Sequence, residues 1–418
     1  MTRVAARQTE PVARASVTPE AGTHSSGFWV VAYAFLIVMA FATLPSPLYG
    51  IYKVVDHLSS FTITIVYAIF AAGTIAALLA ENRIAGILGR RGVMLGAVAT
   101  MMVAAALLAA WKGLPVLIIG RLLTGVAAGL AAGTAITYLI ELRLRVHPGE
   151  SIVFARTVGT SISVGALGVG PLIAGCLAEW ASWPLTLSYL VVLGLGAVAL
   201  VGLLFVPETG TKEAHAERQA SRHRSLRLPI PAAAGTVTAF ASNGLFAGLA
   251  GLILAVTLGR TSHALAGATL FLVFSCGVVS QVATTKLSAS LVLALGTLSM
   301  LVGLVLLVVS VRLPTPSLAF FLTSGALTGA GVGAVFKGTS GIVLEAAAPE
   351  DRLAMTSRLL IVLYVGLSIP VVGVGIALKQ GASIPNTVLG FAILVALGVS
   401  VSGWALLRRH QPSGGGGG

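Results

Sequence analysis

Long apolar runs alternate with short charged or Pro/Gly-rich breaks along this chain of 418 residues. Each run covers about 20 residues or more without alternating polar and apolar positions, which is typical of membrane-spanning helices and not of barrel strands. The pattern predicts an all-α membrane protein. Twelve spans are expected, at residues 28–50, 61–80, 93–112, 115–140, 157–178, 184–205, 231–257, 264–285, 289–311, 316–344, 357–378 and 386–407.

The breaks between the runs also predict how the chain is divided. Two sets of six spans, 28–206 and 231–407, flank the longest internal loop, a cytoplasmic linker at 207–230. Residues 1–27 are polar and expected to be a disordered cytoplasmic segment, and 408–418, which end in SGGGGG, a flexible cytoplasmic tail. The first apolar run is too long for the apolar region of a signal peptide and is interpreted as a span.

The fourth and tenth spans have similar sequences. LLTGVAAGLAAGTAITYLIEL (122–142) aligns without gaps on ALTGAGVGAVFKGTSGIVLEA (326–346). The matched pairs are Leu123 with Leu327, Thr124 with Thr328, Gly125 with Gly329, Gly129 with Gly333, and Glu141 with Glu345. The alternative is chance matching between Ala/Gly/Leu-rich helices. The shared register of glycines and glutamate favours a repeat, and therefore two pseudo-symmetric six-helix bundles, an architecture found in secondary transporters.

Composition and charge narrow the class further. The chain is 56% hydrophobic and 9% charged, with a mean hydropathy of +0.98, whereas soluble domains carry about 25% charged residues. The net charge of +13 does not indicate nucleic-acid binding, because the basic residues occupy the loops between spans. Most of the 26 lysines and arginines fall on the side of the N-terminus, which predicts cytoplasmic termini in a plasma (inner) membrane. The opposite side holds Lys53, Lys112, Arg260, Arg312 and Lys379.

The sequence offers no pattern for catalysis or a cofactor. Cys176 and Cys276 fall in or beside apolar runs, and no CxxC motif or Cys/His cluster suggests a metal or redox site. Neither a GxSxG nor an HExxH motif is present, and no predicted span contains a histidine. The protein is therefore expected not to be an enzyme.

Arg121 is the only charged side chain in the apolar stretch from Val116 to Ile140. Placing arginine at the centre of a membrane helix costs about 2.5–3.5 kcal/mol on insertion scales. An ionisable group at this depth normally faces a cavity or a partner, although bonding to backbone carbonyls alone is the alternative. Lys337 is the second charged group inside a span and is expected at a different depth.

The loop after the second span, ENRIAGILGRRGVML, carries Gly89, Arg90 and Arg91. It resembles the inter-span signature of the major facilitator superfamily, Gly-x-Leu-Ala-Asp-Arg-x-Gly-Arg-Arg, although Gly86 stands where the family has the aspartate. The resemblance implies a cytoplasmic gate that latches the two halves and in which Arg90 pairs with Glu141. The missing aspartate leaves half of that latch unsupported, and a merely positive-inside loop is the alternative.

Two further motifs resemble the same family. Arg121 begins an Arg-x-x-Thr-Gly element in the fourth span, similar to the family's Arg-x-x-Gln-Gly, whose arginine lines the central cavity in relatives and is linked to proton movement. In the fifth span, Gly170, Pro171 and Gly175 match an element, Gly-Pro-x-x-Gly-Gly, that marks the antiporter branches, while Ala174 departs from it. The resemblance covers about residues 28–407.

Other polar side chains in the predicted spans are candidates for the transport cavity, with helix-to-helix hydrogen bonding as the alternative. They are Asn243, Gln281, Tyr67, Tyr138 and Tyr364. All 13 acidic residues fall in termini, loops or span ends, so a proton site is expected at Asp56 or Glu81. A cavity with two cations and no acid should disfavour cationic substrates and admit neutral or anionic ones.

Together these features predict a monomeric secondary active transporter that uses an ion gradient and is surrounded by membrane lipids. Proton-coupled efflux of a small, largely apolar compound is the favoured version. The alternatives are uptake of a sugar or organic anion by symport, with Lys337 holding the anionic group, and a receptor that binds without moving solute.

Overall fold

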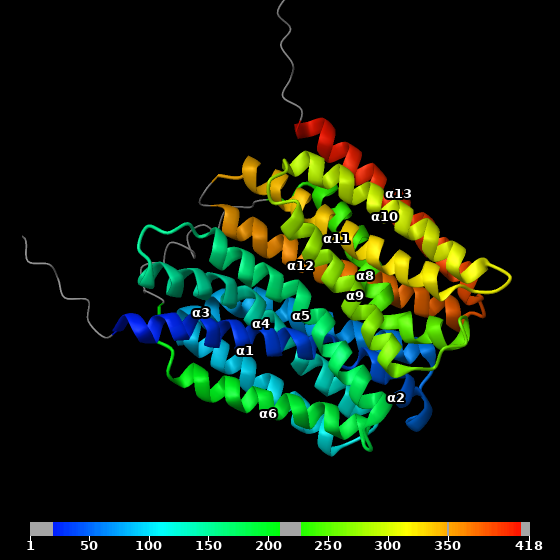
Figure 1. Ribbon diagram of the computed structural model, residues 1–418, viewed down its shortest axis with the longest axis horizontal. Coiled ribbons are helices and arrows are strands. Elements are labelled where there is room, and N and C mark those ends of the chain that lie inside the picture. Colours follow the sequence, from blue (N-terminus) through cyan, green and yellow to red (C-terminus); the bar gives the residue numbers. More distant parts are fainter. Residues whose placement is uncertain (1–19, 210–226, 349–350, 411–418) are drawn as a thin grey trace, which may run out of the picture.

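The computed structural model describes residues 20–209, 227–348 and 351–410, and this part of the chain consists of helices and connecting loops. In Figure 1 the first helix group, α1–α6, lies beside the second helix group, α8–α13. The first group comprises α1 (Glu20–Thr43), the 3₁₀ helix η1 (Ser46–Leu48), α2 (Tyr49–Val55), α3 (Ser60–Ala110), α4 (Leu114–Val146), α5 (Val153–Trp180) and α6 (Pro184–Leu204). The second comprises α8 (Ile230–Val256), α9 (His263–Ala283), α10 (Ala289–Arg312), α11 (Leu318–Ala346), α12 (Arg352–Lys379) and α13 (Ile384–His410).

Twelve helical segments of the described chain are long and apolar enough to cross a membrane. The prediction of an all-α membrane protein is therefore confirmed, while several predicted boundaries are wrong. The first span runs over Ser26–Val55 and is broken near Pro45 and Pro47, where η1 and α2 follow α1. Proline lacks the backbone N–H that a continuing helix would need, so the chain turns at this point.

The second and third spans are joined in α3 instead of being separated by the predicted loop. Gly89 is the one residue inside α3 with non-helical backbone angles, φ 71° and ψ 177°, and the helix kinks there. A left-handed φ of this kind is accessible to glycine at little cost. The residues between Glu81 and Gly89 are therefore helical.

Helix ends also extend beyond the apolar runs. α4 continues past the predicted end at residue 140 to Val146, because its charged last turns can project into water. The helix α1 begins at Glu20, so the last part of the segment predicted to be disordered is helical. Residues 1–19, 210–226 and 411–418, on which the predictions of a disordered terminus, a linker and a flexible tail mainly fall, lie outside the described residues.

The repeat seen in the sequence is visible in the packing of α4 and α11. A Cβ atom on Gly125 would lie 2.1 Å from the carbonyl oxygen of Phe70 in α3, and one on Gly329 would lie 2.0 Å from that of Val273 in α9. One turn later, Gly129 and Gly333 approach the same two neighbouring helices equally closely. Small residues of this kind let membrane helices come into backbone contact. Each central helix is thus packed in the same way against the second span of its group.

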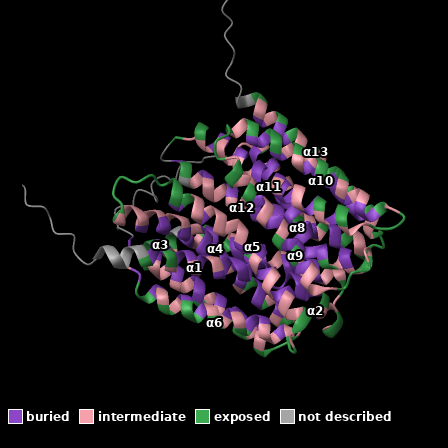
Figure 2. Cartoon of the chain, in the orientation of Figure 1, coloured by how far each residue is buried: buried purple, intermediate pink, exposed green. Residues whose placement is uncertain are grey.

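Burial follows the same arrangement. Figure 2 shows buried residues concentrated where the two groups meet and more exposed ones on peripheral helices such as α6 and α13. The first span of each group, containing α1 or α8, is buried over most of its length. The outer surfaces expose large apolar side chains, among them Trp183, Phe205 and Leu394, as expected where lipid replaces water.

Two helix pairs form most of the contact between the groups. α5 packs along α9, where a Cβ on Gly175 would lie 2.5 Å from the carbonyl oxygen of His263. α3 packs along α12 between two contacts. At one end the Lys379 ammonium lies over the ring of Phe61, 4.8 Å from its centroid, and further along Phe70 makes an edge-to-face contact with Tyr364. We refer to the end of the molecule that carries Lys379 as the Lys379 end.

The tight contact between α5 and α1 generates a prediction. A Cβ on Gly170 would lie 1.8 Å from the carbonyl oxygen of Ala40, so Gly170→Ala must push the helices apart and should lower stability by about 1–3 kcal/mol. Gly194→Ala is the control, because nothing lies within 4 Å of a Cβ there and alanine favours a helix. Thermal unfolding of the purified protein in detergent measures both. Equal Tm values for the two variants would show that the contact is not close.

Candidate functional site

The side chain of Arg121 is completely enclosed, with 0% of its surface exposed. Its Nη1 donates a hydrogen bond to the carbonyl oxygen of Ala42 at 2.6 Å. Ala42 lies in the last turn of α1, where helix carbonyls have no intrahelical partner and carry partial negative charge. The guanidinium also lies over the rings of Phe70, at 4.8 Å from the centroid, and Tyr67, at 5.9 Å. Arg121 therefore faces protein and not lipid.

Several polar atoms around Arg121 have no partner. The Nε and Nη2 atoms of Arg121 and the hydroxyls of Tyr49 and Tyr67 are buried without a hydrogen bond. Both tyrosines are close enough to Arg121 to interact with it electrostatically. Buried donors left unpaired are costly, and each calls for an explanation such as an absent water or ligand. We call Ala42, Tyr49, Tyr67, Phe70 and Arg121 the Arg121 cluster.

The charge balance of this cluster defines what it can bind. Among the described residues, the ion pairs are Arg90 with Glu141 and Arg143 with Glu150, so no carboxylate pairs with Arg121. A buried cation with free N–H groups attracts a carboxylate, another anion or a carbonyl oxygen. The aromatic rings beside it can pack against an apolar body. The cluster is suited to a neutral or anionic group joined to an apolar or aromatic part.

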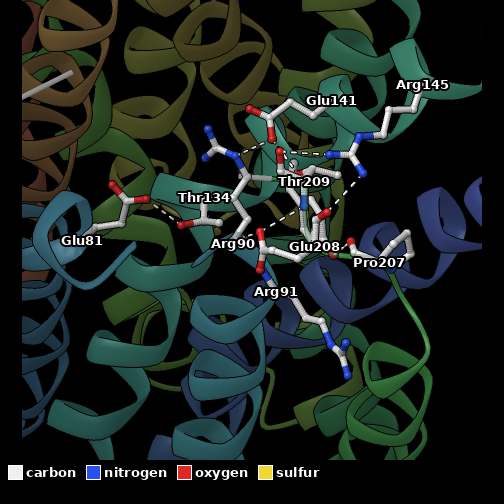
Figure 3. A network of polar contacts seen from close by, with 10 residues as sticks. Glu81, Arg90, Arg91, Thr134, Glu141, Arg145, Pro207, Glu208 and Thr209 are labelled. Atoms are coloured by element: carbon white, nitrogen blue, oxygen red, sulfur yellow. Dashed lines mark hydrogen bonds and ion pairs between the residues drawn. The ribbon is translucent and has the colours of Figure 1, made fainter. Parts of the chain in front are cut away.

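A second polar network is formed by Arg90, Arg91, Glu141 and Glu208, and we call it the gate network (Figure 3). It lies at the end of the molecule opposite Lys379, because the span that begins at Ser60, beside Lys379, ends at Glu81. Arg90, of which 1% is exposed, pairs through Nε with Glu141 at 2.5 Å. The hydroxyl of Thr209 donates to the same Glu141 oxygen at 2.7 Å. The structure thus brings together Arg90 and Glu141, as the family resemblance implies. Their role as a gate stays a prediction.

Glu208 is the residue that organises this network. Its two carboxylate oxygens accept the backbone N–H groups of Arg90 and Arg91, each at 2.9 Å. These N–H groups follow the kink at Gly89 and begin the second part of α3, so Glu208 caps a helix N-terminus. A Cβ on Gly89 would lie 2.4 Å from the Glu208 carboxylate, so any larger residue there would displace the capping side chain.

The segment 207–209 is bound from several sides. Arg145 donates to the carbonyl oxygens of Glu208 at 3.1 Å and of Thr209 at 3.2 Å. Tyr138 donates to that of Pro207 at 2.8 Å. Arg91 adds a short hydrogen bond to the carbonyl of Leu204. The end of α6 is therefore fastened to α3 and α4.

Comparison with known proteins places this architecture. The family model of the Major Facilitator Superfamily matches residues 30–290. The chain belongs to the Major Facilitator Superfamily. The solved structure of a variant of the nucleoside transporter NupG is similar, with a TM-score of 0.67 and 11% identity, covering 92% of this chain and 100% of that chain. No curated protein matches the sequence.

As a superfamily member the protein is a non-enzymatic, multi-pass membrane transporter. The family resemblance also makes a prediction about the loop that carries Gly89, Arg90 and Arg91. The resemblance implied that this loop latches the two halves together. In the described residues, the contacts of Arg90 and Arg91 all lie on the α1–α6 side. Glu208, directly after α6, binds the backbone N–H groups of both residues, while their side chains bind Glu141 and the carbonyl of Leu204.

The remaining cavity candidates separate into two sets. Tyr67 belongs to the Arg121 cluster, and Tyr364, which is 3% exposed, packs edge-to-face on Phe70 beside it. Asn243 in α8 is also buried, with its Oδ1 unpaired, as expected for a side chain facing a cavity. Tyr138 does not belong with them, because its hydroxyl is used by Pro207 in the gate network.

Lys337 is likewise held away from the Arg121 cluster. Its ammonium donates to the carbonyl oxygen of Gln281 at 2.5 Å and to the hydroxyl of Thr284 at 3.2 Å. Both partners lie at the C-terminal end of α9, where a positive charge is favoured by the helix dipole. Lys337 thus binds the C-terminal end of α9. Gln281 contributes its backbone carbonyl to this interaction and not its side-chain amide.

The two candidate proton sites lie at opposite ends. Glu81 is 7% exposed and accepts a hydrogen bond from Thr134 at 2.6 Å, near the gate network. Asp56 ends α2 and has one carboxylate oxygen buried without a partner. Its charge acts on Lys112, whose pKa is lowered by burial and raised by Asp56.

Gly170, Pro171 and Gly175 form the contact face of α5. A Cβ on Gly170 would meet α1, and one on Gly175 would meet α9. The carbonyl of Pro171 lies 2.3 Å from the position of a Cβ on Gly267 of α9. The contacts of α5 with α1 and with α9 therefore depend on this short segment.

Sequence reasoning missed three residues of the two polar sites. Glu208 and Thr209 were visible only as the end of the sixth span, although an acid directly after a span in a basic segment is a signal for a cap. Tyr49 was missed because it lies beyond the Pro45 and Pro47 break, where it appeared to be the end of a span.

The ion pair of the gate network gives the next prediction. Arg90→Ala removes the ion pair with Glu141. Because Arg90 is 1% exposed but 27% of the Glu141 side chain is exposed, the expected loss of stability is about 2–4 kcal/mol, somewhat less than for a fully buried pair. The more exposed pair of Arg143 with Glu150 is the comparison, with 26% and 37% of the side chains exposed, and Arg143→Ala should lower stability less than Arg90→Ala. Denaturant unfolding with a double-mutant cycle over Arg90 and Glu141 measures the coupling. A coupling energy near zero would contradict the assignment.

Proposed function

We propose that this protein is a secondary active transporter that exports a small, largely apolar compound, neutral or anionic, by alternating access and proton antiport. The observation that carries the proposal is the Arg121 cluster. An enclosed guanidinium with two free nitrogens beside aromatic rings is a site where binding energy is available to a ligand.

Alternating access is supported by how the two helix groups meet. α3 and α12 are in contact from Phe61 with Lys379 through Thr64 with Gly375 to Phe70 with Tyr364. These contacts close the Lys379 end, which the distribution of basic residues assigns to the outside. The arrangement corresponds to a carrier whose Arg121 cluster is shielded from the outside, and rocking of the groups would expose it there.

Export and antiport are supported by the fifth-span element. Pro171 lacks a backbone N–H, so α5 can bend at the point where Gly170 contacts α1 and Gly175 contacts α9. A bend there would alter the contact within the first group and the contact between the groups together. We assign proton binding to Glu81, because it is an enclosed carboxylate that is hydrogen-bonded, within the part of the chain that the structure describes, to the neutral hydroxyl of Thr134 and not to a cation.

We further propose that the protein is a monomer in the plasma membrane with both termini in the cytoplasm. Residues 28–206 and 231–407 would be its two moving bundles. Symport uptake of a sugar or organic anion is less well supported, because its anion-holding group, Lys337, is engaged at the end of α9. The receptor alternative predicts binding without flux.

The substrate class can be found by comparing cells with and without the gene for accumulation of and resistance to a panel of small compounds. A compound identified in this way is then tested in proteoliposomes with a pH gradient imposed in either direction. Antiport predicts that substrate and protons move in opposite directions. Parallel movement would establish symport instead, and saturable binding without flux would establish a receptor.

The proposed site predicts that loss of the charge at Arg121 and loss of the charge at Lys337 affect flux differently. Arg121→Gln should reduce flux at least about 100-fold, as expected when a charged hydrogen-bonding partner of the substrate is lost. Lys337→Gln is the matched control and should retain most of the flux, because that side chain terminates a helix. Insertion and Tm of both variants are checked first. Full flux in an inserted Arg121→Gln protein would refute the proposed site.

A further inference from the structure

A cavity of about 450 Å³ lies at the Lys379 end, away from the Arg121 cluster and the gate network. It is built from both helix groups, which meet there. Its walls include Lys53, Ser60 and Phe61 from α2 and α3, and Val256, Lys379 and Ile384 from α8, α12 and α13. Its volume falls within the range of small-molecule sites.

Two ammonium groups give this cavity its chemistry. The Nζ of Lys53 donates to the Ser60 hydroxyl at 3.0 Å, and that of Lys379 lies over the Phe61 ring. Within the described residues neither lysine forms an ion pair with a carboxylate. A lysine ammonium has three donors, so both lysines keep the capacity to bind an anion between them.

The cavity lies at the level where the membrane spans end. One span ends at Val256 and another at Lys379, while others begin at Ser60 and Ile384. Residues at span ends occupy the interfacial region of a bilayer, where lipid headgroups are found. The two lysines are therefore at headgroup height.

A shallow apolar crevice adjoins the cavity between α8, α12 and α13 and encloses only about 10 Å³. It shares Leu252, Leu378 and Ile384 with the cavity and extends to Leu245 and Val388. From Leu252 to Leu245 the crevice follows α8 for about 10 Å toward the middle of the membrane, at about 1.5 Å per residue. Its lining is almost entirely aliphatic, so it offers a surface along which a hydrocarbon chain can lie, although it is too small to enclose one.

We propose that this cavity binds an anionic phospholipid, with the phosphate between Lys53 and Lys379 and one acyl chain lying along the apolar surface of the crevice. The pair of cations selects the negative headgroup, and the crevice selects an amphiphile over a soluble anion. Such a lipid contacts both helix groups at once. It therefore binds best while the Lys379 end is closed and favours that state over one in which α3 and α12 separate.

The test uses the purified full-length protein and measures lipid retention by native mass spectrometry. Palmitoyl-oleoyl phosphatidylglycerol is compared with the zwitterionic phosphatidylcholine of the same chains. Lys53→Gln combined with Lys379→Gln should weaken phosphatidylglycerol binding by about tenfold or more, because each interfacial lysine contributes separately to anionic lipid binding. Phosphatidylcholine should bind weakly to every variant.

The control combines Lys112→Gln with Arg260→Gln. It removes the same charge from loops assigned to the same side, but neither residue lines the cavity. It should leave phosphatidylglycerol binding unchanged. An equal loss in both double variants would show a diffuse surface attraction and overturn the proposal. The Tm of each variant establishes that folding is intact.

A phosphatidylglycerol with a photoreactive acyl chain tests the crevice. Labelling should map by mass spectrometry to α8 between residues 245 and 253 or to α12 between 374 and 378. Labelling confined to other helices would overturn the proposal. So would binding of free oleate by a protein that does not retain phosphatidylglycerol, because the site would then belong to a soluble amphiphile. The result is independent of the transport proposal, since no flux is measured.

Discussion

Backbone-to-backbone approach at glycine is the constraint on which this structure depends. Gly125 in α4 and Gly329 in α11 each lie against a carbonyl of the neighbouring helix, at a distance that no side chain could occupy. In a membrane the hydrophobic effect does little to hold helices together, so packing of this closeness has to do so. It places the central helix of each group and thereby fixes where every side chain on that helix can point.

Within this repeated framework, Arg121 breaks the symmetry. The register that superposes Gly125 on Gly329 places Gly325 opposite Arg121, so the second group has no corresponding charge. The guanidinium is stabilised by the free carbonyl at the end of α1 and by two aromatic rings, yet two of its nitrogens stay unpaired. A structural arginine would be expected to use its donors fully. The asymmetry therefore favours a function for this residue in addition to holding α1 against α4.

Charges elsewhere are used at the ends of helices. Glu208 caps the second part of α3, Lys337 terminates α9, and Arg145 binds the carbonyls that follow α6. Each interaction places a charge where backbone groups have no intrahelical partner, which is favourable near the interface and costly in the hydrocarbon layer. This explains how a chain with 9% charged residues can still build a dense polar network at the Arg90 end.

The sequence by itself determined the fold class, the twelve spans and the repeat, because apolar run length and glycine register are local properties of the chain. It also singled out Arg121, whereas the pairing of Arg90 with Glu141 was implied by the family resemblance. Only the tertiary structure decided which polar residues share a site. Lys337 and Tyr138 were grouped with Arg121 because they lie in spans, but their hydrogen bonds go to α9 and Pro207. Tyr49 became part of the Arg121 cluster because the first span is broken before it. Glu208 became part of the gate network because the kink at Gly89 frees the backbone N–H groups that it binds. The physical reason is that a side chain's partner depends on helix rotation and helix ends, which are set by contacts between segments distant in sequence.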